Sequence, residues 1–202
     1  MANRTEAYSA GLMSEAPWFL EFKKMVFLQH DGVSPEEIKR KCIEENLFGM
    51  PKEYRARRTY GYLLNRLNLM DDNLIDLFCN SDLATQKMIN FILILKGDLL
   101  FSEFINEVYR EKVIIGYTEL TAADINVFFT DKAAHDEGMS QWIETTFKRL
   151  RSGYFQFMVD ANLLRKEKSK YIITPPILDI ALERYLQYNG EERLLKAITG
   201  VS

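Results

Sequence analysis

The sequence predicts a mainly α-helical protein, with a helical N-terminal lobe containing a helix-turn-helix-like pair and a C-terminal winged-helix-like lobe containing one small β-hairpin. Apolar residues recur at helical spacing along most of the 202 residues, and good N-cap residues precede several of these runs. Near the C-terminus a polar segment separates two short β-type runs, which is typical of a hairpin. We place the lobes at residues 1–80 and 81–202, although no Gly-, Ser- or Pro-rich linker marks the boundary.

Local signals define the helices expected in the N-terminal lobe. Ser34 suits an N-cap, and Pro35 fits the first helical position, where a backbone N–H would be unpaired in any case. Asp71 and Asp72 favour another helix start, because carboxylates are stabilised at the positive end of the helix dipole. The expected helices span about residues 17–30, 35–45, 51–70 and 71–79.

The C-terminal lobe carries the same kinds of signal. Asp82 is expected to cap one helix, and Thr121 with Asp124 forms a capping box before another. The β-branched run at 113–117 suggests a strand, and residues 163–173 suggest the hairpin, with a polar loop of four residues. The expected helices span about residues 83–96, 100–109, 122–134, 140–162, 178–188 and 191–198, with a turn at 135–138.

The overall charge does not indicate a nucleic-acid partner, but the local charge does. The chain has a net charge of −3, whereas nucleic-acid-binding domains usually carry an excess of basic residues. One basic segment lies in the helix expected at 51–70, on the face opposite its apolar stripe, with Glu53 as its one acid. A capped helix followed by a basic helix resembles a helix-turn-helix. The alternative is a solvated face on a core helix. The basic residues of this segment are Lys52, Arg55, Arg57, Arg58 and Arg66.

A second basic segment follows the order helix, long helix and hairpin, which is the order expected of a winged helix-turn-helix. Between residues 148 and 170 there are seven basic residues and two acids. The positive charges of such a wing repel one another unless an anion binds there, and phosphates are the usual partner. Contacts to phosphate give affinity and register but no base specificity. The basic residues are Lys148, Arg149, Arg151, Arg165, Lys166, Lys168 and Lys170.

Motifs for catalysis are missing, so we expect a protein that is not an enzyme and needs no cofactor or metal. The two histidines, His30 and His135, stand apart from any ligand spacing, and neither a phosphate-binding P-loop nor a G-x-S-x-G elbow occurs. Asp71-Asp72 could hold Mg²⁺ in a nuclease, but a helix start explains both acids. Cys42 and Cys79 have no spacing for zinc or a disulfide framework.

Hydropathy and the N-terminus favour a cytoplasmic protein with no membrane partner. Residues 1–6 contain no apolar region of a secretory signal. The most lipid-like stretch, residues 88–95, has eight residues without charge and is far shorter than the roughly 20 residues of a bilayer span. We interpret it as a buried core helix.

Several long blocks of sequence, spread over nearly the whole chain, can be compared with known families. The blocks are residues 8–12 (YSAGL), 17–21 (PWFLE), 42–49 (CIEENLFG), 51–58 (PKEYRARR), 81–87 (SDLATQK), 107–112 (EVYREK) and 157–164 (FMVDANLL). They resemble the BrxA family. The resemblance implies a small accessory component, without a known catalytic centre, of BREX, a bacterial system that restricts phage and marks host DNA by methylation. The family has also been compared with a helical transcription-antitermination protein, which makes RNA an alternative ligand.

Together, these observations predict a non-catalytic BREX accessory protein that contacts double-stranded DNA through its basic helices and wing. Other BREX proteins are expected partners, which it would help to position. A protein–protein adaptor whose basic faces dock acidic partners remains an alternative, and so does an RNA-binding protein.

Overall fold

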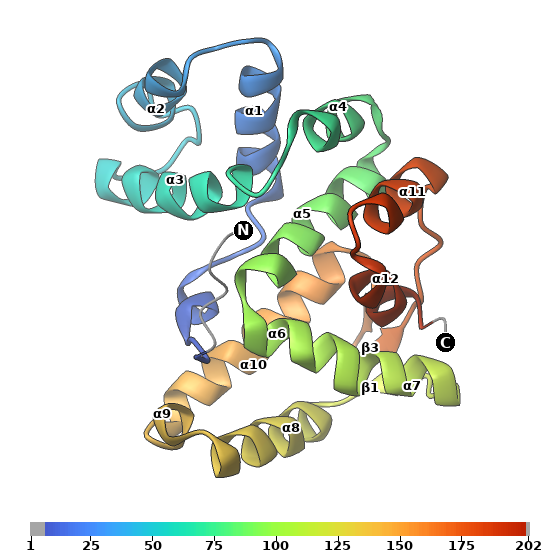
Figure 1. Ribbon diagram of the computed structural model, residues 1–202. Coiled ribbons are helices and arrows are strands. Elements are labelled where there is room, and N and C mark those ends of the chain that lie inside the picture. Colours follow the sequence, from blue (N-terminus) through green and yellow to red (C-terminus); the bar gives the residue numbers. More distant parts are fainter. Residues whose placement is uncertain (1–6, 201–202) are drawn as a thin grey trace.

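Helices form most of the molecule, as a computed structural model that describes residues 7–200 shows (Figure 1). The first part, blue to teal in Figure 1, groups α1, α2 and α3 at one end, followed by α4. The mainly α fold class is thereby confirmed. The elements of this part are η1 (Gly11–Ser14), α1 (Phe19–His30), α2 (Pro35–Ile43), α3 (Glu53–Leu67) and α4 (Asp72–Asn80).

Helix starts in this part follow the expected capping chemistry. The Ser34 hydroxyl accepts a hydrogen bond from the Glu37 N–H (3.3 Å), with Pro35 at the first position of α2. The Asp71 carboxylate accepts from the Leu74 N–H (2.8 Å) and begins α4. Both caps confirm the prediction. They were predictable because each joins residues only three positions apart.

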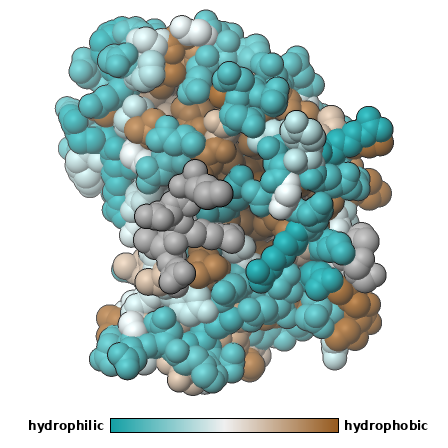
Figure 2. All heavy atoms as spheres, viewed as in Figure 1, coloured by the Kyte–Doolittle hydropathy of each residue, from teal (hydrophilic) through white to brown (hydrophobic). Residues whose placement is uncertain are grey.

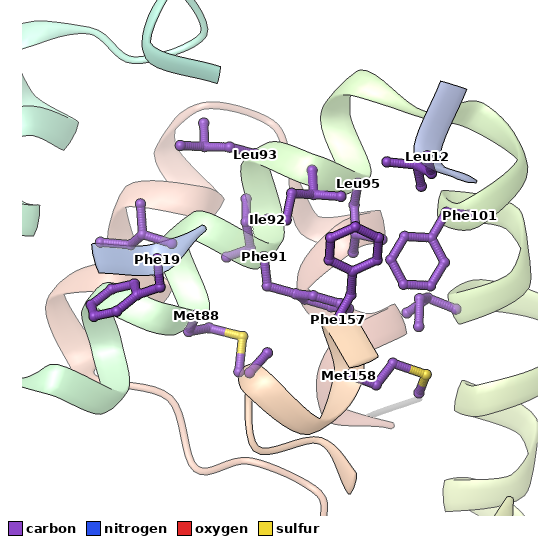
Figure 3. Packing of buried hydrophobic residues seen from close by; sticks show 14 of the residues in the cluster. Leu12, Phe19, Met88, Phe91, Ile92, Leu93, Leu95, Phe101, Phe157 and Met158 are labelled. Carbon is purple, nitrogen blue, oxygen red and sulfur yellow. The ribbon is translucent and has the colours of Figure 1, made fainter. Parts of the chain in front are cut away.

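Helix α5 (Leu83–Gly97) is the centre of the core. Its segment 88–95 is buried throughout, which confirms the expected core helix. Figure 3 shows its side chains between Phe19 of α1 and Phe157 of α10. One continuous hydrophobic cluster joins residues from both expected lobes, so the division between residues 80 and 81 stays a prediction.

Residues 113–117 form no strand, contrary to the prediction. Helix α6 (Leu99–Phe104) continues through a π-helical turn, Ile105–Tyr109, into α7 (Arg110–Ile115). Packing against α12 (Glu192–Thr199) overrides the β propensity, since Val113 lies so close to Gly200 that a Cβ there has no room. Gly116 then ends α7 in the left-handed conformation, with φ +85°.

A three-stranded antiparallel sheet contains the expected hairpin and one strand that the sequence did not reveal. The strands are β1 (Glu119–Leu120), β2 (Leu164–Glu167) and β3 (Lys170–Ile173), in the order β1-β3-β2. The hairpin is confirmed, but its turn has two residues rather than four, because Glu167 pairs with Lys170. Strand β1 pairs with β3, opposite Tyr171 and Ile172.

The remaining helices lie in two places, at the end opposite the first helices and beside α4 and the π-helical turn (Figure 1). The Thr121–Asp124 capping box begins α8 (Ala122–His135), as predicted. The helix expected at 140–162 is shorter: α9 (Glu137–Ser140) occupies part of the expected turn, and α10 (Glu144–Asp160) follows it. Helix α11 (Ile180–Tyr188) and α12 complete the chain. Within the described residues, no helix is long and apolar enough to cross a bilayer.

Asp98 links α5 to α6 and is expected to make stability depend on pH. Its carboxylate accepts from the Phe101 N–H (2.8 Å), and burial raises its pKa to about 6. The protonated group therefore stabilises the fold below about pH 4, and this contribution is lost as the pH rises through about 6. Asp98→Asn keeps the capping oxygen, so it should flatten this dependence and raise the free energy of unfolding at pH 7 by about 1–3 kcal/mol. Urea denaturation at several pH values measures this.

Asp82 provides the control for this prediction. It caps α5 through the Thr85 N–H (2.8 Å), but it is exposed, and that hydrogen bond lowers its pKa. Asp82→Asn should therefore give no increase in stability at pH 7. An unchanged pH profile in Asp98→Asn would contradict the role given to Asp98.

Candidate nucleic-acid interface

The exposed stripe of α10 is polar and basic. Its buried face includes Leu150, Tyr154 and Phe157, which fixes the opposite face toward solvent. Exposed side chains recur there every three or four residues, as on one face of a helix. They are Glu144, Thr145, Lys148, Arg149, Ser152 and Gln156, so the stripe has one acid, at the start of the helix, and none after it.

Lys148 and Arg149 are free to bind an anion. Both are exposed, and neither takes part in an ion pair or a side-chain hydrogen bond within the described part of the chain. Arg151, in contrast, is half-buried and donates a hydrogen bond to the Asn126 side chain of α8. It ties α8 to α10 and is therefore less available than its neighbours.

An aromatic stack fixes the hairpin beside α10. The rings of Phe155 on α10 and Tyr171 on β3 lie 3.9 Å apart at 12°. The stack holds the two-residue turn, where Lys168 has a φ of +53°, next to the helix. We name the hairpin β2–β3 the wing.

The four basic residues of the wing differ in their surroundings. Arg165 pairs with Glu167, and Lys170 pairs with Glu119 of β1 (3.0 Å). The Lys166 ammonium lies 5.7 Å from the Tyr171 ring centre. Lys168 is exposed and has no partner within residues 7–200. The wing is therefore less positive than its lysine and arginine count suggests.

Helix α3 presents a second basic surface. Lys52, Arg55, Arg57 and Arg58 are exposed, as predicted. Arg57 pairs with Glu53 (2.7 Å), and the Arg55 Nε donates to the Tyr54 hydroxyl (3.3 Å). This surface lies on a separate element from α10 and the wing, and Figure 2 shows it within a mostly hydrophilic region.

Arg66 does not belong to that surface, contrary to the prediction. Its side chain is 4% exposed and lies under the N-terminal segment. It donates hydrogen bonds to the carbonyls of Pro17 (2.7 Å) and Ala16 (2.9 Å) and pairs with Glu15 (2.8 Å). The last turn of α3 is covered by chain that precedes α1, so Arg66 cannot reach a phosphate.

Some side chains suited to nucleic acid were not predicted from the sequence. Asn and Gln side chains can hydrogen-bond base edges. Gln156 on α10, Asn65 on α3 and Asn68 at the C-cap of α3 are exposed on the same elements as the basic residues. Helical spacing from Lys148 and Arg58 is the signal that could have found them.

Three carboxylates that could carry chemistry, Asp71, Asp82 and Asp179, serve as helix caps. A pocket of about 370 Å³ lies between the start of α5 and the segment at 174–182, and its two carboxylates, Asp82 and Asp179, cap helices. Asp71, the residue considered for a magnesium site, caps α4. Across residues 7–200, no three His, Cys, Asp or Glu side chains gather where they could hold a metal ion.

Comparisons with known proteins agree with the sequence blocks. A family model described as BrxA matches residues 6–190. A protein of Bacillus cereus (strain H3081.97) named BREX protein BrxA is 33% identical over 197 residues, which cover 98% of each chain. The crystal structure of an uncharacterized protein from Magnetospirillum magneticum is similar with a TM-score of 0.81 over 96% of this chain and 99% of that chain. Its identity of 17% shows the shared fold alone.

Proposed function

The chain belongs to the BrxA family, and from that premise we propose that it is a DNA-binding, non-catalytic accessory component of a BREX phage-defence system. It contacts duplex DNA through α10 and the wing, with α3 as a second contact, and helps to position other BREX proteins in the cytoplasm. The proposed phosphate contacts are Lys148, Arg149, Arg151, Arg165, Lys166, Lys168, Lys170, Lys52, Arg55, Arg57 and Arg58.

The exposed stripe of α10 carries this proposal. It combines two unpaired cations, Lys148 and Arg149, with three side chains that can hydrogen-bond, and its one exposed carboxylate, Glu144, stands at the start of the helix. Cations of this kind contact phosphates, while Ser152 and Gln156 suit base edges in the major groove.

The order of elements supports α10 as the helix that enters the major groove. A winged helix-turn-helix consists of a strand, two helices and a hairpin, and its first strand pairs with the last strand of the hairpin. Here β1, α8, α10, β2 and β3 follow that order, with the four-residue α9 in the connection between α8 and α10, and the sheet order is β1-β3-β2. In helix-turn-helix proteins the second helix lies in the groove.

A fluorescence-polarisation titration of labelled duplex DNA tests the proposal. We expect binding at roughly 50 mM salt that weakens as salt rises, with a log–log slope of about 0.9 for each phosphate contact. Structured RNA of equal length is the competitor. Failure to bind duplex at that salt would reject the proposal, and stronger binding to RNA would favour the RNA-binding alternative. If the protein does not bind duplex DNA but does bind other BREX proteins through its basic faces, the adaptor alternative is supported.

A further inference from the structure

The solvent-facing side of α3 contains a glycine that the fold does not need. Gly61 lies in the interior of the helix and is exposed, and a Cβ built on it would meet no atom within 4 Å. Its φ is not positive, so the backbone would accept alanine. Glycine is a poor helix former compared with alanine, because it loses more backbone freedom on folding. No contact within residues 7–200 offsets that loss of stability.

Gly153 on α10 differs from Gly61, because other parts of the chain surround it. A Cβ there would make ordinary van der Waals contacts, 3.6 Å from the Phe157 ring and 3.8 Å from the Leu12 carbonyl oxygen. The N-terminal segment packs against α10 at that point. Gly61 has no such neighbour, so the helix surface at Gly61 is open to a group outside this chain.

The residues around Gly61 indicate what approaches it. No acidic residue occurs in α3 after Glu53, and Glu53 is paired with Arg57. Arg58 lies one turn before Gly61, and Asn65 lies one turn after it, on the same side of the helix. A surface of arginine and asparagine without a free carboxylate complements an anionic partner rather than an apolar one, and a phosphate backbone is the anionic partner of the proposed function.

Arg58 is held in place on this side of α3. Its guanidinium lies 5.8 Å from the Tyr62 ring centre and donates to the Ser14 carbonyl (3.5 Å). Tyr62 in turn stacks on Trp18 (5.7 Å, 27°), which has a φ of +42°. A side chain that is ordered before binding loses less entropy when it contacts a phosphate.

We infer that Gly61 is the point at which the sugar–phosphate backbone of duplex DNA lies directly against α3, between Arg58 and Asn65. This inference rests on the proposed function and adds a second, α3-centred contact to that of α10. Adding a side chain at Gly61 pushes the backbone away from both neighbours.

Substitutions of increasing size at Gly61 test the inference. Gly61→Ala should raise the thermal midpoint by about 2–4 °C, because alanine favours the helix and meets open space. The same variant should bind a duplex of about 20 base pairs roughly tenfold more weakly, with a smaller salt slope. Gly61→Gln should bind more weakly still. Asn73→Ala, at an exposed uncharged position of α4, is the control and should leave the affinity unchanged.

The outcomes separate this inference from the proposed function. If the wild-type protein binds duplex and Gly61→Ala binds equally well, the inference is wrong and the proposed function stands. If the wild-type protein does not bind duplex at low salt, the proposed function is wrong, and so is the inference that rests on it. A fall in the thermal midpoint of Gly61→Ala would show that the fold itself requires the glycine, which also overturns the inference.

Discussion

Replacing Arg66 by alanine is expected to lower the free energy of unfolding by about 3–5 kcal/mol. The guanidinium is buried and satisfies the carbonyls of Ala16 and Pro17, the Glu15 carboxylate, and the Asn90 side-chain oxygen (3.3 Å). Its removal leaves these acceptors without their donor, and the charge of Glu15 remains half-buried. Urea denaturation monitored by circular dichroism measures the loss.

Arg57→Ala is the matched control, since it removes the same type of side chain from the same helix. The Arg57–Glu53 pair is more than half exposed at both residues, so its loss should change stability by no more than about 0.5 kcal/mol. Combining Arg66→Met with Glu15→Gln removes both buried charges and should recover part of the stability lost in Arg66→Ala. A loss below about 1 kcal/mol in Arg66→Ala would contradict this account.

Arg66 also shows why part of the candidate site escaped prediction. Arg55, Arg58 and Arg66 recur at helical spacing on one side of α3, and that pattern predicts one exposed basic face. The sequence cannot tell that residues 15–17 return to cover the last turn of the helix. Exposure depends on which distant segments pack where, while periodicity reports only which side chains share a face.

The elements of the fold likewise differ in whether local or distant contacts determine them. The caps at Ser34, Asp71 and Asp82 were predictable, because each depends on a side chain and an N–H three residues apart. The core helix α5 was predictable from its uncharged run. Strand β1 was not, since its two residues become a strand only by pairing with β3, about fifty residues later. Residues 113–115 are helical for the corresponding reason, because α12 packs on them.

Reversing two charges on α10 is expected to have the largest effect on DNA binding. Lys148→Glu/Arg149→Glu should weaken binding to duplex at least about a hundredfold at roughly 50 mM salt, because two contacts are replaced by repulsion. The salt slope should fall by about 2. Neither side chain has a partner in residues 7–200, so the thermal midpoint should change little.

The control for this variant changes the net charge by the same amount elsewhere. Arg184→Glu/Lys196→Glu alters two exposed cations on α11 and α12 that take part in no ion pair within the described residues. If both double variants weaken binding equally, the affinity reflects the overall charge of an acidic protein, and α10 is not the interface. If Lys148→Glu/Arg149→Glu alone loses binding, a local surface attracts DNA to a chain whose net charge of −3 would otherwise repel it. Such a protein binds through the arrangement of its charges, because α10 presents cations while carboxylates neutralise those at Arg57, Arg165 and Lys170.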